Sequence, residues 1–233
     1  MTENSEHRWP ERIVIVRHGQ SEFNVAKDLL EEGLKERLEA LVNVRNADIK
    51  LTEIGIWQAK ETGKYLAEQD FKFDICYSSP YKRALQTAEK IINQFDYELK
   101  IFQDNRVREK EFGVLHGLTG EAIREQFPEH YRARKRDGKY WHRLLGGENY
   151  PDVEFRLHSF LGTLVRDWPR KNILIAAHQV PCILFRALFE HLREEEVLTL
   201  GDYNNCGISE YIIDESKLPK NRMKLVEWNK VVY

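Results

Sequence analysis

Short runs of apolar residues alternate along this chain with longer segments of helical periodicity. Six of the runs predict strands, at residues 12–16, 74–77, 99–102, 172–176, 208–213 and 222–227. The segments with helical periodicity lie between them, at residues 52–69, 80–95, 151–168 and 181–192. Strands that alternate with helices favour βαβ units, in which helices cover both faces of a mainly parallel sheet. The pattern therefore predicts an α/β fold with three layers, helix, sheet and helix.

Two segments interrupt this alternation. Residues at about 25–45 are highly charged and carry a stripe of leucines, which predicts a helical insertion over one end of the sheet. Residues at about 104–150 are rich in charge, aromatic rings and glycine. A connection of that length inside a compact domain is more often functional than idle, so we expect it to form a cap. With no repeat and no low-complexity linker, we expect residues 1–233 to form a single domain.

Composition narrows the function classes. The net charge of −2 gives no general attraction to nucleic acid or to an anionic membrane, so neither is expected as a partner. The first residues are polar and unlike a signal peptide, and no apolar run approaches the roughly 20 residues of a membrane helix. Cys76, Cys182 and Cys206 are an odd number without metal-like spacing, which suggests buried thiols in a reducing compartment. We therefore expect a cytoplasmic protein.

Two of the predicted strands end in a histidine. The run IVIV at 13–16 leads into Arg17 and His18, and the run at 172–177 leads into His178. Ligand sites in open parallel sheets form outside the carboxyl ends of the strands. A single histidine in such a place is usually a polar residue that returns to solvent. Two histidines at equivalent strand ends indicate a functional site, provided that the two strands are neighbours in the sheet.

The segment SSPYKRALQTA at 78–88 adds a second cation to this edge of the sheet. Ser79 can cap a helix, and Pro80 suits the first helical position, so we expect Arg83 in the first turn. A cation there opposes the helix dipole, but a helix N-terminus with an arginine is a good anion site. A surface arginine that folds back over the sheet is the equal alternative.

Two arginines and two histidines together favour an anion as the ligand. Arginines beside the histidines would repel a divalent metal ion, so no metal is expected. Phosphate is the best match, because guanidinium groups pair with its oxygens and an imidazole can attack phosphorus. A general acid is offered by Glu109 or Glu111 in the predicted cap, and their spacing alone does not choose between them.

The ordered set of these motifs resembles the histidine phosphatase superfamily, also called phosphoglycerate mutase-like. The resemblance covers residues 12 to about 213. It rests on RHG at 17–19 with Ser21 and Asn24, LTEIG at 51–55, SSPYKRALQTA at 78–88, REKEFGVLHG at 108–117, and the strand that ends in His178. The RHG tripeptide alone is a weak signal, whereas the set in this order is specific.

The resemblance implies a role for each matching residue. His18 is the expected nucleophile, and Glu109, four residues before Gly113, is the expected proton donor. The phosphoryl group would be bound by Arg17, Asn24, Arg83 and His178. No metal and no organic cofactor are implied.

Two departures from the family pattern concern the identity of the substrate rather than the phosphoryl pocket. The residue after the first glycine is often glutamate in the family, and here it is Gln20. The second histidine is commonly followed by glycine, and here Gln179 follows it, with Pro181 expected in the first turn of the next helix. Gln20, Ser21 and Gln179 are further candidates for contacts with the substrate.

Within the superfamily we expect a phosphatase that acts on a small phosphorylated metabolite. The segment at 138–153 is more similar to phosphatases, and the chain ends soon after its last predicted strand, with little left for the lid that mutases use. A phosphoglycerate mutase or a sugar-bisphosphatase is the alternative. The mutase is supported by the basic run at 132–136, which is otherwise a solvated helix face. A third possibility is a non-catalytic phospho-ligand binding protein. Tyr140, Trp141 and Arg143 either rim the site or pack the cap.

Overall fold

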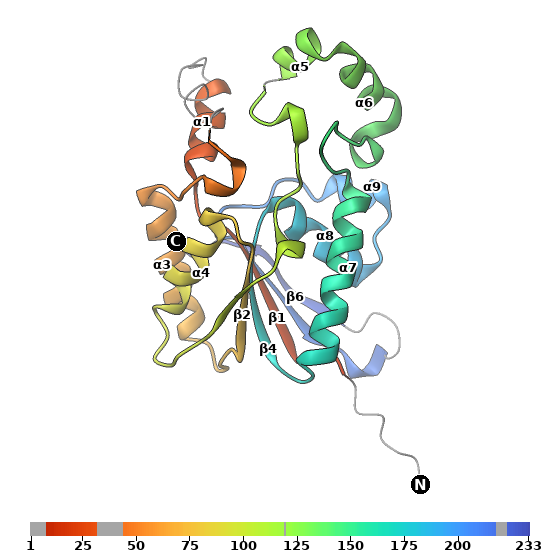
Figure 1. Cartoon of the computed structure of the whole chain (residues 1–233). Helices are drawn as coiled ribbons and strands as arrows, with labels where there is room; N and C mark the ends of the chain where they lie inside the picture. The colour runs from red at the N-terminus through yellow and green to blue at the C-terminus, as the bar shows by residue number, and fades with distance from the viewer. Residues whose placement is uncertain (1–7, 32–43, 119, 218–222) are drawn as a thin grey trace.

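The computed structural model describes residues 8–31, 44–118, 120–217 and 223–233, and its centre is a six-stranded sheet (Figure 1). The strand order is β3-β2-β4-β1-β5-β6. In chain order the strands are β1 (Arg12–Arg17), β2 (Ile75–Ser78), β3 (Ile101–Gln103), β4 (Asn172–Ala177), β5 (Ile208–Ile213) and β6 (Met223–Lys230). The predicted strands are thus confirmed, with shifts of one to three residues at some ends.

The four strands from β3 to β1 are parallel, and β5 and β6 are added to the sheet as an antiparallel pair. β1 and β4 are adjacent and in register, with Arg17 opposite Ala177. The residue that follows each strand is a histidine, so the register brings His18 and His178 to the same edge of the sheet. The tertiary pairing expected for the two histidine-bearing strands is therefore correct.

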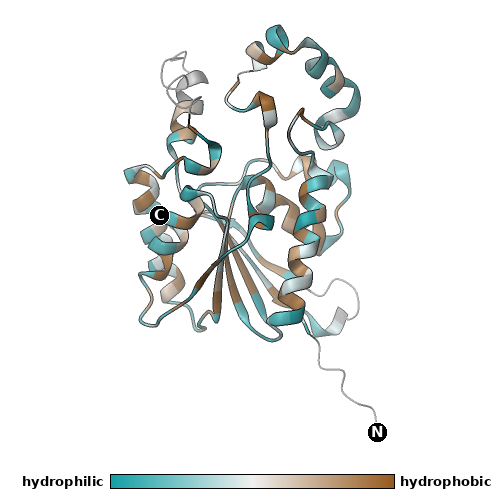
Figure 2. Cartoon of the chain, in the orientation of Figure 1, coloured by the Kyte–Doolittle hydropathy of each residue, from teal (hydrophilic) through white to brown (hydrophobic). Residues whose placement is uncertain are grey.

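Helices cover both faces of the sheet, as the alternating pattern predicted. α3 (Glu53–Ala67) and α4 (Lys82–Ile92) lie on one face, and α7 (Tyr150–Asp167) and α8 (Gln179–Glu190) lie on the other (Figure 1). Alternate strand residues supply the two cores: Ile13 and Ile15 pack with α7 and α8, while Val14 and Val16 pack with the side of α3 and α4. Figure 2 shows the strands mostly brown, whereas the helices beside the sheet carry both teal and brown segments.

The segment at 104–150 rises above the carboxyl ends of the parallel strands (Figure 1). Its elements are η2 (Asn105–Val107), η3 (Gly113–Leu115), α5 (Gly120–Gln126) and α6 (Pro128–Trp141). α1 (Glu22–Glu31) and η1 (Asn46–Asp48) lie at the same end of the molecule. The remaining described elements are α9 (Glu194–Thr199) and η4 (Glu215–Lys217). The helix predicted at 25–45 is present as far as Glu31, and residues 32–43 lie outside the described part.

Two helix starts differ from the sequence prediction. α4 begins at Lys82 after an N-cap at Tyr81, so Ser79 and Pro80 belong to the preceding turn, where the Ser79 hydroxyl accepts the Tyr81 N–H at 3.2 Å. The predicted cap was wrong because Ser79 is used by the site instead, as shown below. α8 begins at Gln179, directly after His178, which places Pro181 in the first turn as expected. No helix within the described residues is long and apolar enough to cross a membrane.

Candidate active site

The ends of β1 and β4 place two imidazole rings face to edge. The ring centroids of His18 and His178 are 5.0 Å apart, and the ring planes are inclined by 62°. Both side chains are buried, with 3% and 0% of their surfaces exposed. Two buried histidines at the end of a sheet need partners for their ring nitrogens, and those partners define the site.

A close backbone approach fixes the turn that carries His18. A Cβ atom on Gly19 would lie 2.4 Å from the carbonyl oxygen of Gly55, and one on Gly55 would lie 2.0 Å from the carbonyl oxygen of Gln20. The Gly19 N–H donates to the Thr87 hydroxyl at 3.0 Å. The glycines of the RHG and LTEIG motifs are therefore explained together, because any side chain at either would push the two turns apart.

One nitrogen of His18 carries the lone pair that a nucleophile needs. Its Nδ1 lies 2.7 Å from the Gly19 carbonyl oxygen, to which it donates, so the lone pair is on Nε2. In this structure Arg83 Nε–H donates to this Nε2 at 3.3 Å. Burial, helped by the charges of Arg83 and Arg17, lowers the pKa of His18 well below its usual value. The imidazole is consequently neutral at neutral pH, as a nucleophile must be.

Two guanidinium groups lie near His18. Arg83 lies in the first turn of α4, as predicted, and its Nη1 donates to the Asn46 carbonyl oxygen at 2.6 Å. Burial lowers the pKa of Arg83 to about 10, which keeps it charged at neutral pH. Arg17 donates from Nη1 to the Tyr203 carbonyl oxygen. Arg17 Nε is buried and has no hydrogen-bond partner within the described residues, so it is available to a ligand.

His178 has one occupied and one unoccupied ring nitrogen. Its Nε2 lies 2.8 Å from the Ser79 hydroxyl oxygen, and its buried Nδ1 has no hydrogen-bond partner in the part of the chain that the structure describes. Burial and the neighbouring charge of Arg83 lower the pKa of His178 well below its usual value. When the Ser79 hydroxyl donates to Nε2, Nδ1 carries the ring hydrogen and can donate it to an anionic ligand.

The structure separates the two candidate acids. Glu109 is buried and lines the cavity, and its Oε1 accepts the backbone N–H groups of Lys110 at 2.8 Å and Val180 at 3.3 Å. Glu111 instead accepts the hydroxyl of Tyr81 and pairs with Arg108 at 3.5 Å. Glu111 is not among the residues that line the cavity. Geometry therefore favours Glu109, the residue that the resemblance implied.

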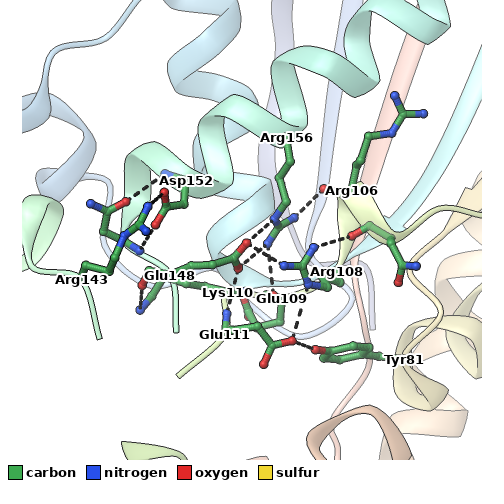
Figure 3. Close-up of polar contacts among 12 residues, drawn as sticks. Tyr81, Arg106, Arg108, Glu109, Lys110, Glu111, Arg143, Glu148, Asp152 and Arg156 are labelled. Carbon is green, nitrogen blue, oxygen red and sulfur yellow. Dashed lines mark hydrogen bonds and ion pairs between the residues drawn. The ribbon is translucent and has the colours of Figure 1, made fainter. Parts of the chain in front are cut away.

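A polar network behind Glu109 holds its segment to α7 (Figure 3). Arg156 of α7 donates to the carbonyl oxygens of Arg106 and Glu109, and its Nε donates to Glu148 at 3.0 Å. Glu148 also accepts the Glu111 N–H at 3.0 Å. Burial would raise the pKa of Glu148, but hydrogen bonds, first of all from Arg156, lower it below its usual value. The pair thus ties the root of the cap to the body of the molecule.

Arg17, His18, Arg83 and Glu109 line a cavity of about 510 Å³, whereas His178 is fully buried and is not among the lining residues. Its charged and polar lining comprises Arg17, His18, Ser21, Asn24, Asn46, Arg83, Glu109, His116 and Gln179. Its apolar lining comprises Phe23, Phe112, Leu115, Leu118 and Val180. No group of three or more His, Cys, Asp or Glu side chains that could hold a metal ion occurs within the described residues.

The remaining predicted contacts are distributed unevenly. Asn24 lines the cavity, and its Oδ1 accepts the N–H and the hydroxyl of Ser21 at 3.0 and 2.8 Å, which leaves its amide nitrogen to donate. Ser21 lines the cavity too, but its hydroxyl is used by Asn24. Gln179 lines it while donating to Asp202 at 2.7 Å. Gln20 is outside the lining, and its side-chain oxygen accepts the Thr52 hydroxyl at 2.8 Å.

The cap residues that the sequence left open are engaged elsewhere. Tyr140 is buried against Tyr150, with ring centroids 5.6 Å apart. Trp141 donates to Glu194, and Arg143 donates to Asp152. Tyr140 is therefore packed in the cap, whereas Trp141 and Arg143 are exposed, and none of the three is among the cavity lining. The basic run at 132–136 belongs to α6, and it too is absent from the cavity lining within the described residues.

Sequence reasoning missed one residue that supports the nucleophile. The side-chain amide of Asn205 donates to the His18 carbonyl oxygen at 3.0 Å and to Asn24 Oδ1 at 3.3 Å. Asn205 precedes β5, which is antiparallel to β1. Because β5 runs antiparallel to β1, the residues just before β5 lie at the carboxyl end of β1. The pair of asparagines at 204–205 was therefore the sequence signal that could have identified Asn205.

Comparison with known proteins agrees with this geometry. The sequence model of the histidine phosphatase superfamily (branch 1) matches residues 13–229. A 2,3-bisphosphoglycerate-dependent phosphoglycerate mutase of Treponema denticola is 29% identical over 82% of this chain and 82% of its own length. Fructose-2,6-bisphosphatase of Saccharomyces cerevisiae is 32% identical over 80% of this chain. The match spans only 36% of the yeast protein.

Among solved structures, a mycobacterial glucosyl-3-phosphoglycerate phosphatase superposes with a TM-score of 0.72 at 25% identity. The superposition covers 94% of this chain and 99% of the mycobacterial one. The similarity therefore extends to the sheet, the helical layers and the segment above the strand ends.

Proposed function

Because the chain belongs to the histidine phosphatase superfamily, we propose that it hydrolyses small phosphomonoesters through a phosphohistidine intermediate. One observation carries the proposal. His18 lines a cavity together with Arg17 and Arg83, its Nε2 accepts Arg83 Nε–H at 3.3 Å, and both Arg17 and the adjacent His178 carry a buried nitrogen without a partner among the described residues. A nucleophile surrounded by anion-binding groups matches the needs of phosphoryl transfer.

In the first step the phosphorus–oxygen bond of the ester breaks and a bond from phosphorus to His18 Nε2 forms. Charge in such a transition state spreads over three equatorial oxygens, so catalysis consists mainly of positioning and electrostatic stabilisation. Arg17 and Arg83 supply the positive charge, and His178 and the Asn24 amide supply further hydrogen bonds. The Nδ1–H bond to Gly19 stabilises the positive charge that develops on the ring of His18.

Glu109 handles the proton in both steps. It protonates the leaving oxygen as the ester bond breaks, and its carboxylate then takes a proton from the attacking water. That water breaks the bond between nitrogen and phosphorus and releases inorganic phosphate. The two backbone N–H groups on Oε1 orient the carboxyl group, so its second oxygen is the one free to face the substrate.

Phosphoglycerate mutase activity is the second candidate, because a mutase aligns with four-fifths of this chain. A mutase must return the phosphoryl group to a second alcohol rather than to water. We favour hydrolysis because the basic run at 132–136, the best source of a carboxylate site, is absent from the cavity lining within the described residues.

Release of phosphate from p-nitrophenyl phosphate in the presence of EDTA tests the proposal. We expect turnover by the wild type and none by His18→Ala. A parallel assay supplies 3-phosphoglycerate with a bisphosphoglycerate primer. Interconversion faster than hydrolysis would make the protein a mutase, and binding of phosphate without any turnover would make it a phospho-ligand binding protein.

A further inference from the structure

The cavity extends beyond the phosphoryl-binding groups into an apolar part. Phe112, Leu115 and Leu118 follow one another in the segment above His18, and Phe23 of α1 lies opposite. The rings of Phe23 and His116 stack with centroids 5.2 Å apart and planes inclined by 14°. We call these five residues the outer pocket. A substrate bound at His18 would place its alcohol part here.

Positive charge in the described lining is confined to the phosphoryl end. Arg17 and Arg83 are the cationic side chains of the described lining, and both are placed to bind the transferred group. His116 could add a charge to the outer pocket, but burial and the nearby charge of Arg83 lower its pKa. At neutral pH the outer pocket therefore presents carbon atoms and a neutral imidazole.

Two cationic side chains of the described part that are close to the outer pocket in sequence, Lys110 and Arg108, have other partners. Lys110 donates to the Glu148 carbonyl oxygen at 3.3 Å, and its Nζ lies 4.4 Å from the centre of the Phe112 ring. Arg108 pairs with Glu148 at 2.7 Å. Neither side chain is part of the described lining. A second anionic group on a substrate would thus find no cation in the outer pocket as described.

We propose that the substrate is a phosphomonoester whose alcohol part is uncharged and largely apolar. The inference rests on the proposed phosphatase function. Two guanidinium groups balance one phosphate dianion, and a further carboxylate or phosphate would lose water without gaining a partner. Apolar groups gain instead, by about fourfold in binding for each methylene removed from water. The relatives whose names refer to bisphosphorylated ligands would differ from this chain in the charge of the ligand part that lies outside the transferred phosphate.

A pair of nearly isosteric aryl phosphates tests the charge rule. In 4-carbamoylphenyl phosphate and 4-carboxyphenyl phosphate the phosphate and the ring are the same, and only the second compound carries an additional charge. We expect kcat/KM to be about 10–100-fold higher for the carbamoyl compound, from the cost of an unpaired charge. Equal values, or a preference for the carboxylate, would overturn the inference while leaving the phosphatase function intact. Absence of phosphate release from both compounds would instead remove the phosphatase function itself.

A charge placed in the outer pocket provides the reciprocal test. Leu118→Lys should raise the ratio of kcat/KM for the carboxy compound to kcat/KM for the carbamoyl compound about three- to fivefold, since it supplies the missing partner. Leu198→Lys, at an exposed leucine of α9 outside the lining, is the matched control and should leave this ratio unchanged. No response at Leu118, or equal responses from both variants, would contradict the assignment of the outer pocket.

Discussion

Replacement of Glu109 by glutamine removes a proton donor and keeps its shape. The glutamine side-chain oxygen can still accept the N–H groups of Lys110 and Val180, which lie 2.8 and 3.3 Å from Glu109 Oε1. The loss then measures the ionisable group rather than the shape of the side chain. General acid catalysis is worth roughly 10²–10⁴-fold, or about 2.7–5.5 kcal/mol, and is needed only when the leaving group is basic.

The assay compares an alkyl phosphate with p-nitrophenyl phosphate. The alkoxide needs a proton as it leaves, so Glu109→Gln should lose roughly 10²–10⁴-fold on the alkyl ester. The p-nitrophenolate ion is stable at neutral pH, so the loss on its ester should be much smaller, provided that formation of phospho-His18 limits the rate.

Glu111→Gln is the matched control for this comparison. Glu111 pairs with Arg108 at a half-exposed site, and a glutamine there still accepts the Tyr81 hydroxyl. An exposed ion pair contributes at most about 1 kcal/mol, so rates should change less than about fivefold on either ester. Equal losses on the two esters for Glu109→Gln would refute the acid role, and a selective loss on the alkyl ester for Glu111→Gln would transfer the role to that residue.

Four further results are expected. Arg83→Ala should lower kcat roughly 10²–10³-fold or more while the protein stays folded; a fully active but less stable variant would make Arg83 structural. Arg156→Met should reduce turnover of alkyl phosphates more than turnover of p-nitrophenyl phosphate, because Arg156 acts by positioning Glu109. Arg156→Lys should lose less. Equal losses on the two esters would mean that Arg156 contributes only to the stability of the fold. The acid limb of kcat/KM should lie below pH 6.5, because burial lowers the pKa of His18. The free energy of unfolding should fall as the pH drops below about 6.5, because the two histidines take up protons at higher pH in the unfolded chain than in the folded one. The fall should be up to about 1.4 kcal/mol per pH unit for each of His18 and His178. Urea unfolding curves recorded at several pH values measure this dependence.

The parts of the fold that depend on periodicity could be predicted from the sequence. Ile13 to Val16 are buried on both faces, and such a run is recognisable as a central parallel strand without knowledge of its neighbours. Arg83 was placed correctly even though the helix begins two residues later than expected, since the Ser79 hydroxyl lies against His178 and accepts the Tyr81 N–H instead of capping.

Side-chain partners were less accessible to sequence reasoning. The choice between Glu109 and Glu111 depends on which one turns toward the cavity, and that is decided by Arg156 and Glu148, which lie about 40 residues further along the chain. Gln20 was expected near the substrate, and that contact stays a prediction, with its side chain on Thr52 in this structure. Such contacts join residues that are far apart in the sequence, so no local sequence pattern predicts them.

Rapid quenching during turnover tests the central claim most directly. Wild-type protein mixed with a ³²P-labelled phosphomonoester and quenched within milliseconds should carry label that is stable in base and labile in acid. Peptide mapping should place it on His18, with Nε2 as the attached atom because Nδ1 is held by Gly19. His18→Ala should remain unlabelled. Label on a serine or on His178, or full turnover by His18→Ala, would contradict the account.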